Sequence, residues 1–231
     1  MHDLAPLIDH TLLRADAASA DFSRLCSEAR THGFATVCVP SAWVRFCVER
    51  LADASPGVCT VVGFPLGCVS TAAKVAEAQQ AVRDGAVELD VVLHLGALRD
   101  RHYRTVTTDL IAVVQAAEGR VVKVILETAA LTPEQIRVGA ALAQSAGAQF
   151  VKTSTGFGAG GATPEAVALL RETVCSQIGV KASGGIRDEA SARLMIAAGA
   201  TRIGTSAGVT IVAALGGGSL EPSASPATSR P

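Results

Sequence analysis

The chain has 231 residues, 49% hydrophobic and 18% charged, with 22 glycines but one tryptophan and one tyrosine. Its formal net charge of -1 at pH 7 provides no broad cationic field, which argues against nucleic-acid and membrane partners. The N-terminal residues are interrupted by Asp3, Pro6 and Asp9, and the six cysteines lack CxxC spacing, so we expect a cytoplasmic protein without a secretion signal or disulfide framework.

Short runs rich in β-branched residues alternate with helical patterns along the chain. The strand candidates cover residues 7–13, 34–40, 58–65, 86–93, 120–127, 150–156, 179–185 and 201–206. Helical patterns include residues 72–86, 132–148, 163–174 and 187–200, with apolar residues at helical spacing. Eight alternations in a chain just under the ~250 residues typical of this architecture predict the α/β class and a closed parallel (β/α)8 TIM barrel.

Helix boundaries and the end of the pattern set the expected domain limits. Thr132-Pro133 and Thr163-Pro164 each read as an N-cap followed by proline at the first helical position, and Gly147 and Gly199 as helix ends. The alternation stops near residue 216, where a segment rich in glycine, serine and proline begins. We therefore expect one barrel domain over residues 1–215 and a disordered tail over residues 216–231.

Four of the candidate strands carry a charged residue within apolar sequence: Asp90 in VELDVVL, Lys123 in VVKVILE, Lys152 in FVKTST and Lys181 in GVKASGG. Burying a charge is costly unless the charge is paired or used in chemistry. An ion network inside the barrel is one interpretation. Lys152 and Lys181, however, lie at equivalent points of consecutive strands, just before the rim where barrel active sites form. This placement favours a catalytic pair.

The two lysines suit attack on a carbonyl group. Two ammonium groups about 5 Å apart repel by ~3 kcal/mol at an effective dielectric near 20, which corresponds to roughly two pKa units on one of them. One amine would then be partly neutral near pH 7, as a Schiff-base nucleophile requires. We predict Lys152 as nucleophile, Lys181 as its activating neighbour, and Asp90 either as a proton relay or as the counter-charge of a lysine.

Glycines and hydroxyl groups follow the last three predicted strands, in TSTGFGAGG, SGGIR and IGTSAG. The loops after strands seven and eight hold a phosphate in many barrels, with backbone N–H groups as donors. Gly184, Gly185, Gly204 and Ser206 are the candidate phosphate ligands. Arg187 either assists the phosphate or is a solvated residue of the helix that follows.

A zinc-dependent mechanism is disfavoured, and we expect neither a metal nor an organic cofactor. The histidines form no HxH or HExxH pair; they are His2, His10, His32, His94 and His102.

Taken together, IDHTLL, VCV, CTVVGFPLG, ELDVV, VKVILET, FVKTSTGF, GGAT, VKASGGIR and RIGTSAG resemble the deoxyribose-phosphate aldolase family, in that family's order and over about residues 5–215. The resemblance implies reversible cleavage of 2-deoxy-D-ribose 5-phosphate to D-glyceraldehyde 3-phosphate and acetaldehyde, in deoxyribonucleoside catabolism. It implies that Lys152 forms the imine, Lys181 tunes it and relays protons, and Asp90 acts with water as proton donor and acceptor.

The same resemblance extends to substrate contacts. It implies that Asp9 and Thr11 approach the substrate hydroxyls, that Thr155 lines the pocket, and that the glycine loops bind phosphate. A homodimer is the family-based expectation for assembly. Cys38 aligns with a family cysteine near the pocket and is either reactive or, as is commoner for a buried strand cysteine, inert.

The sequence departs from the family pattern in several places. The asparagine usual after ELDMVI is His94, Pro40-Ser41 replaces the Asn-Pro often seen after VCV, and Ala129 replaces a cysteine. A C-terminal tyrosine found in some members is missing, since Tyr103 is the only tyrosine. The first three changes remove no catalytic group, whereas the tyrosine is thought to assist proton transfer in the members that have it, so its loss would affect the turnover rate if that role applies here.

Three other functions are consistent with the sequence. They are an aldolase for another sugar phosphate, a barrel isomerase that uses Lys152 and Asp90 only for proton transfer, and a sugar-phosphate sensor without catalysis. Trapping of a covalent imine separates the aldolases from the other two.

Overall fold

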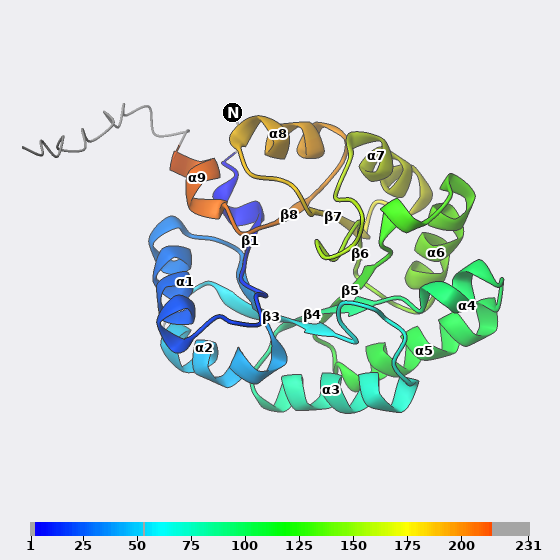
Figure 1. Cartoon of the computed structure of the whole chain (residues 1–231), viewed down its shortest axis with the longest axis horizontal. Helices are drawn as coiled ribbons and strands as arrows, with labels where there is room; N and C mark the ends of the chain where they lie inside the picture. The colour runs from blue at the N-terminus through cyan, green and yellow to red at the C-terminus, as the bar shows by residue number, and fades with distance from the viewer. Residues whose placement is uncertain (1–2, 53, 214–231) are drawn as a thin grey trace, which may run out of the picture.

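The computed structural model describes residues 3–52 and 54–213, in which eight parallel strands close into a barrel surrounded by helices (Figure 1). The strands are β1 (Ile8–Thr11), β2 (Thr36–Val39), β3 (Gly57–Val62), β4 (Glu88–Val92), β5 (Val121–Ile125), β6 (Phe150–Lys152), β7 (Gly179–Ser183) and β8 (Arg202–Thr205). Each strand pairs with the next, and β8 pairs with β1. The predicted (β/α)8 barrel is confirmed, whereas the predicted tail over residues 216–231 lies outside the described residues.

Helices connect successive strands around the outside of the barrel. They are α1 (Ser19–His32), α2 (Val44–Leu51), α3 (Thr71–Arg83), α4 (Leu95–Arg99), α5 (Tyr103–Ala116), α6 (Pro133–Ser145), α7 (Pro164–Thr173), α8 (Glu189–Ala197) and α9 (Gly208–Ala213). Short 3-10 turns lie at η1 (Ala5–Leu7), η2 (Ser41–Trp43) and η3 (Thr128–Ala130). No helix in the described ranges has the length and apolar character needed to span a bilayer.

The predicted helix boundaries are confirmed by their capping bonds. The hydroxyl of Thr132 accepts a hydrogen bond from the backbone N–H of Gln135, and Thr163 caps α7 in the same way. Gly147 and Gly199, which follow α6 and α8, have φ angles of 90° and 108°. A left-handed backbone is the usual end of a helix and favours glycine.

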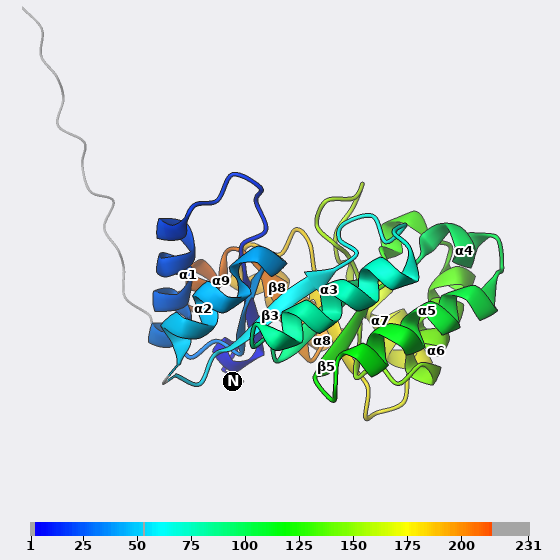
Figure 2. The same ribbon diagram turned by 90° about the horizontal axis from the view of Figure 1, so that it is seen from below.

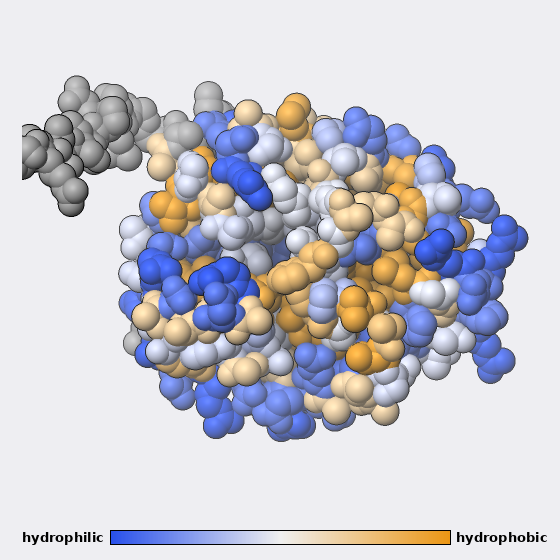
Figure 3. All heavy atoms as spheres, in the orientation of Figure 1, coloured by the Kyte–Doolittle hydropathy of each residue, from blue (hydrophilic) through white to orange (hydrophobic). Residues whose placement is uncertain are grey.

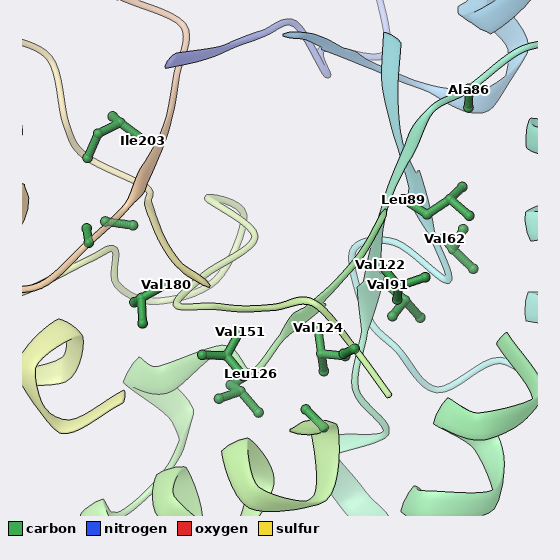
Figure 4. Packing of buried hydrophobic residues seen from close by; sticks show 14 of the residues in the cluster. Val62, Ala86, Leu89, Val91, Val122, Val124, Leu126, Val151, Val180 and Ile203 are labelled. Carbon is green, nitrogen blue, oxygen red and sulfur yellow. The ribbon is translucent and has the colours of Figure 1, made fainter. Parts of the chain in front are cut away.

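Side chains along each strand point alternately outward, to the layer between the strands and the helices, and inward, to the centre of the barrel. Leu89, Val91, Val122 and Val124 belong to the large apolar cluster between the strands and the helices, where they lie side by side (Figure 4). Their neighbours in sequence, such as Asp90 and Lys123, point into the barrel and contact each other there, because successive strand side chains face opposite sides. The apolar shell thus forms outside the sheet and leaves the centre for polar chemistry.

The loops at the carboxyl ends of the strands gather at one end of the barrel. Figure 2 shows the segments that follow β1, β3 and β6 rising together above the barrel. The loop after β7 lies very close to the loop after β6. A Cβ at Gly161 would lie 2.2 Å from the carbonyl oxygen of Gly184, so only glycine fits at this position. This contact fixes the relative position of two walls of the barrel mouth.

A buried ion pair outside the barrel holds α3 and α5 against β4. The Lys74 amine lies 2.7 Å from an Asp109 oxygen and donates to the carbonyl of Val92 at 2.9 Å. The other oxygen of Asp109 accepts from the Thr71 hydroxyl at 2.7 Å. Since Lys74 is fully buried, its charge is stabilised by these partners rather than by water.

We predict that Lys74→Met lowers the free energy of unfolding by about 3–5 kcal/mol, because Asp109 is left as an uncompensated buried charge. The double variant Lys74→Met/Asp109→Leu should recover most of this loss, since apolar replacement of a buried pair is often neutral. Urea unfolding of the single and double variants measures the difference. Strictly additive losses would show that the two side chains are not energetically coupled.

Candidate active site

A cavity of about 450 Å³ opens at the carboxyl ends of the strands. Figure 3 shows this end of the molecule, with hydrophilic side chains around the circumference and less polar ones nearer the middle. Seven of the predicted site residues line the cavity; they are Thr11, Lys152, Thr155, Gly184, Gly185, Gly204 and Ser206. Arg187 also lines it, so its side chain is placed at the mouth rather than only on the outer helix surface.

Three side chains on β4, β6 and β7 meet beneath this cavity. One oxygen of Asp90, Oδ2, lies 2.6 Å from the Lys152 amine and 2.8 Å from the Lys181 amine. Lys152 and Lys181 are Cα partners in the register of the two strands, as their equivalent positions in the sequence predicted. The carboxylate therefore bridges the two amines, and Lys152 is the member of this group that lines the cavity.

Asp9 lies beneath the cavity and is not among the described residues that line it, so its predicted approach to the substrate hydroxyls stays a prediction. Asp9 is fully buried below the cavity, with its Oδ2 2.5 Å from the Lys181 amine and its Oδ1 2.6 Å from Arg202. Thr36 also donates to Oδ1 at 2.8 Å. The contact with Arg202 forms because β1 closes the barrel against β8 and brings Asp9 within reach of the guanidinium. Asp9 therefore forms ion pairs with both Lys181 and Arg202.

A second layer of charge lies under the first. The Lys123 amine contacts Glu88 at 2.5 Å and Asp90 Oδ1 at 2.9 Å, and Arg202 contacts Glu88 at 3.1 Å. Glu88 and Arg202 were missed by the sequence analysis. Glu88 could have been found, because it stands two residues before Asp90 and shares its side of the strand.

These contacts set the protonation of the buried groups. Burial alone would raise the pKa of Asp90, but Lys123, Lys152 and Lys181 hold it well below its usual value. Burial likewise disfavours the charged form of Lys181, and Asp9 and Asp90 outweigh it and raise the pKa of that amine. Lys181 is thus the stably protonated member of the pair. The pKa of Lys181 is not lowered as repulsion between two lysines alone would predict, because the carboxylates of Asp9 and Asp90 lie beside its amine. These carboxylates could not be placed from the sequence.

The charge count singles out Lys152. Within the described residues, this network joins three carboxylates, of Asp9, Glu88 and Asp90, to four cations, the amines of three lysines and one guanidinium. Loss of one proton leaves the network electrically balanced. Lys152 contacts a single carboxylate and lines the cavity, so it is the cation with the fewest partners in the network.

Gly204 lines the cavity and also leaves room for the side chain of Lys181. A Cβ there would lie 2.9 Å from Cε of Lys181 and 2.9 Å from Cβ of Ser183. Only a residue without a side chain lets Lys181 cross this part of β8 toward Asp90. The neighbouring Gly184 and Gly185 have φ angles of 89° and 81°, conformations in which glycine turns its backbone sharply at the rim.

Two cysteines, Cys38 on β2 and Cys59 on β3, lie near the carboxylate of Asp90. Cys38 and Cys59 are register partners, and both are fully buried. A hydrogen bond with Cys59 and the nearby Lys181 hold the pKa of Cys38 below its usual value, whereas burial raises the pKa of Cys59. Cys38 is not among the described residues that line the cavity. Its reactivity stays a prediction.

Potential metal ligands do gather in this network, in two groups within the described residues: Cys38 with Cys59 and Asp90, and Asp9 with Cys59 and Glu88. In each group a carboxylate already contacts Lys123. The histidines serve other contacts. His10 pairs with Glu28 behind β1 and His94 caps α4, while His2 lies outside the described residues.

A buried amine that faces a cavity, beside a bridging carboxylate and a second protonated amine, defines an enzyme site for imine chemistry on a carbonyl compound. Comparison with known proteins agrees with this class. Residues 4–214 match the model of the DeoC/LacD family aldolases.

The chain is 54% identical to deoxyribose-phosphate aldolase 1 of Bacillus licheniformis, over 92% of this chain and 96% of the relative. It is 53% identical to the deoxyribose-phosphate aldolase of a Geobacillus species, over 91% of this chain and 95% of the relative. The tetrameric deoxyribose phosphate aldolase of Aeropyrum pernix superposes with a TM-score of 0.87 at 35% identity, over 93% of this chain and 91% of that chain. The chain therefore belongs to the DeoC/LacD family of aldolases.

We predict that Asp9→Asn lowers the free energy of unfolding at pH 7 by about 3–5 kcal/mol, because two buried cations lose a partner. The cations that surround Asp9 outweigh its burial and hold its pKa below the ordinary value of 3.8. The unfolded chain thus binds this proton first, so the stabilisation by Asp9 is complete above pH 3.8 and is lost as pH falls further.

The difference in stability between wild type and Asp9→Asn should accordingly stay constant from pH 7 to about pH 4 and shrink below it. Urea unfolding monitored by circular dichroism at pH 7, 5, 4 and 3 measures this. Asp16→Asn is the matched control, since Asp16 is an exposed carboxylate on Arg14 and should change little at any pH. A gap that persists unchanged at pH 3 contradicts an ionised Asp9.

Proposed function

We propose that the chain catalyses the reversible cleavage of 2-deoxy-D-ribose 5-phosphate to D-glyceraldehyde 3-phosphate and acetaldehyde, through an imine on Lys152. The observation that carries the proposal is the position of the Lys152 amine, which lines the cavity and lies 2.6 Å from Asp90 Oδ2. Membership of the aldolase family and the names of its curated relatives support the reaction and the substrate.

The chemistry follows from the arrangement of the two amines around one oxygen. Neutral Lys152 attacks the C1 aldehyde, and loss of water from the carbinolamine gives the protonated imine. Removal of the proton from the C3 hydroxyl then breaks the C2–C3 bond, with the electron pair moving toward the imine nitrogen. D-glyceraldehyde 3-phosphate leaves, and the enamine that stays on Lys152 is protonated at carbon and hydrolysed to acetaldehyde.

Asp90 is the group placed to exchange these protons. Its Oδ2 contacts both amines. A proton can therefore pass from the Lys152 amine to Asp90 Oδ2 over 2.6 Å and return through water. Lys181 stays charged throughout, because Asp9 and Asp90 raise its pKa. Its amine lies on the same Asp90 oxygen as the amine of Lys152, and it holds that carboxylate in place between them.

The phosphate group belongs at the rim formed by the loops after β7 and β8. Gly184, Gly185, Gly204 and Ser206 line that side of the cavity, and Arg187 adds a guanidinium. Backbone N–H groups and hydroxyls of this kind bind phosphate in many barrels. The ligands are therefore a small sugar phosphate and an aldehyde, with no metal or organic cofactor required for any step.

We extend the proposal to the setting of the enzyme. All six cysteines are free thiols, which is the usual state in a reducing cytoplasm. A homodimer is the assembly that we expect, and size-exclusion chromatography with light scattering tests it against the tetramer named for the Aeropyrum pernix protein.

We predict that acetaldehyde with a borohydride reductant leaves one ethyl group on the wild-type chain, at Lys152. The sequence contains four lysines, at positions 74, 123, 152 and 181. All four are buried, and only Lys152 lines the cavity among the described residues. Intact mass followed by peptide mapping measures the adduct, which should be absent from Lys152→Met.

Lys152→Arg is the matched control, because a guanidinium keeps the charge but forms no imine. An adduct that persists in either variant, or none in the wild type, removes the Schiff-base mechanism. The isomerase and sensor functions would then become the leading ones.

We predict that Ser206→Glu raises the KM for 2-deoxy-D-ribose 5-phosphate by at least roughly fivefold, because like charges about 4 Å apart repel by about 1 kcal/mol even in bulk water. The KM for unphosphorylated 2-deoxyribose should change little. Thr31→Glu adds the same charge at the far end of α1 and serves as control. Equal effects on both substrates would contradict a phosphate site at this rim.

A further inference from the structure

Glu127 follows β5 at the mouth of the barrel and is unusual in its backbone and its burial. Its φ and ψ angles are 54° and 60°, and only 7% of the residue is exposed. A left-handed conformation is uncommon for a residue other than glycine and persists where surrounding contacts over-determine it. One oxygen, Oε1, is buried without a hydrogen-bond partner. The left-handed backbone and the unpaired buried oxygen both cost free energy, so other contacts of Glu127 must hold the carboxylate in this position.

The contacts of Glu127 converge on one residue of the cavity wall. Its Oε2 accepts a hydrogen bond from the backbone N–H of Thr155 at 3.2 Å and a short one from the Thr155 hydroxyl. The Thr155 oxygen in turn accepts from the backbone N–H of Phe157 at 3.1 Å. Thr155 lines the same cavity as Lys152.

The loop after β6 packs directly on this carboxylate. A Cβ at Gly158 would lie 2.9 Å from Cδ of Glu127, and a Cβ at Gly160 would lie 2.8 Å from Cβ of Ala129. Two glycines thus let the loop approach the end of β5 closely. The carboxylate and the loop hold Thr155 in one orientation from both sides.

This arrangement decides the hydrogen-bonding character of Thr155. A threonine hydroxyl has one proton to donate and two lone pairs. The proton is committed to Glu127 and one lone pair to Phe157, so the remaining capacity is an acceptor, strengthened by the charge behind it. A substrate group that meets Thr155 must therefore be a donor, which selects a hydroxyl over a carbonyl or phosphate oxygen.

We propose that Glu127 is a positioning residue that makes Thr155 an acceptor for the hydroxyl next to the reacting carbonyl of the aldehyde that carries the phosphate. This inference rests on the proposed function. That hydroxyl, on C4 of the sugar, is a donor in both directions of the reaction. The C3 oxygen, by contrast, becomes a carbonyl on cleavage and can no longer donate.

The test is a ratio of kcat/KM values in the synthetic direction, with acetaldehyde as partner. The two acceptors are D-glyceraldehyde 3-phosphate and 3-oxopropyl phosphate, which lacks only the hydroxyl. In Glu127→Met the freed Thr155 proton can turn to the cavity, so the ratio should fall roughly fivefold to tenfold, the worth of one hydrogen bond. Thr155→Val should lower it equally, and the double variant should lower it no further.

Glu127→Gln is the conservative rescue, because its amide oxygen can accept both Thr155 donors; its ratio should stay within about twofold of wild type. Glu127→Asp withdraws the carboxylate by one methylene and should lose the preference, which keeps the test available if Glu127→Met does not fold. An unchanged ratio in Glu127→Met and Glu127→Asp, or a full loss in Glu127→Gln, overturns the proposal. So does equal loss of activity toward both acceptors.

Borohydride trapping of acetaldehyde is measured in parallel on every variant. Acetaldehyde carries no hydroxyl, so the trapped fraction on Lys152 should equal that of wild type. Absence of trapping in wild type would mean that the proposed function itself fails. A normal adduct with an unchanged ratio would remove the role of Glu127 alone.

Discussion

The structure depends on one oxygen atom, Oδ2 of Asp90, which is held between the amines of Lys152 and Lys181. Without it, two largely buried ammonium groups on register-paired strands would repel each other. With it, both amines have a counter-charge, but their surroundings differ. Lys181 is also held by Asp9, whereas Lys152 has no second carboxylate and faces the cavity. The two lysines thus differ in the number of carboxylates that they contact, and this difference supports the proposed role of Lys152 as the nucleophile.

The rest of the barrel makes this arrangement possible. The alternation of β4 sends Leu89 and Val91 into the apolar shell and Glu88 and Asp90 into the centre. Burial outside the sheet stabilises the fold, so the interior is free to hold charge that would weaken an ordinary core. Because every cation there meets a carboxylate, the network is costly to break at any single point. It is correspondingly rigid, as preorganised catalysis requires.

The sequence was sufficient for what depends on local pattern. Strand alternation predicted the barrel, Thr132 and Thr163 predicted two helix starts, and the equivalent places of Lys152 and Lys181 predicted their pairing. The sequence did not reveal the contact between Asp9 and Arg202, because it exists only after β8 closes on β1 and the two residues are 193 positions apart along the chain. Glu127 was likewise invisible as a site residue, since its role comes from a left-handed turn and from a loop that packs on it.

The lysines also affect how the protein meets its own reactants. Aldehydes condense with accessible primary amines, and this chain has placed all four of its lysines out of solvent. Its other basic side chains are arginines and five histidines, and neither a guanidinium nor an imidazole forms an imine with an aldehyde. Released acetaldehyde therefore finds no lysine on the described surface to modify or cross-link. The same feature makes tethering to a solid support through lysine side chains unsuited to this protein, whereas the exposed thiols of Cys68 and Cys175 offer a chemical route.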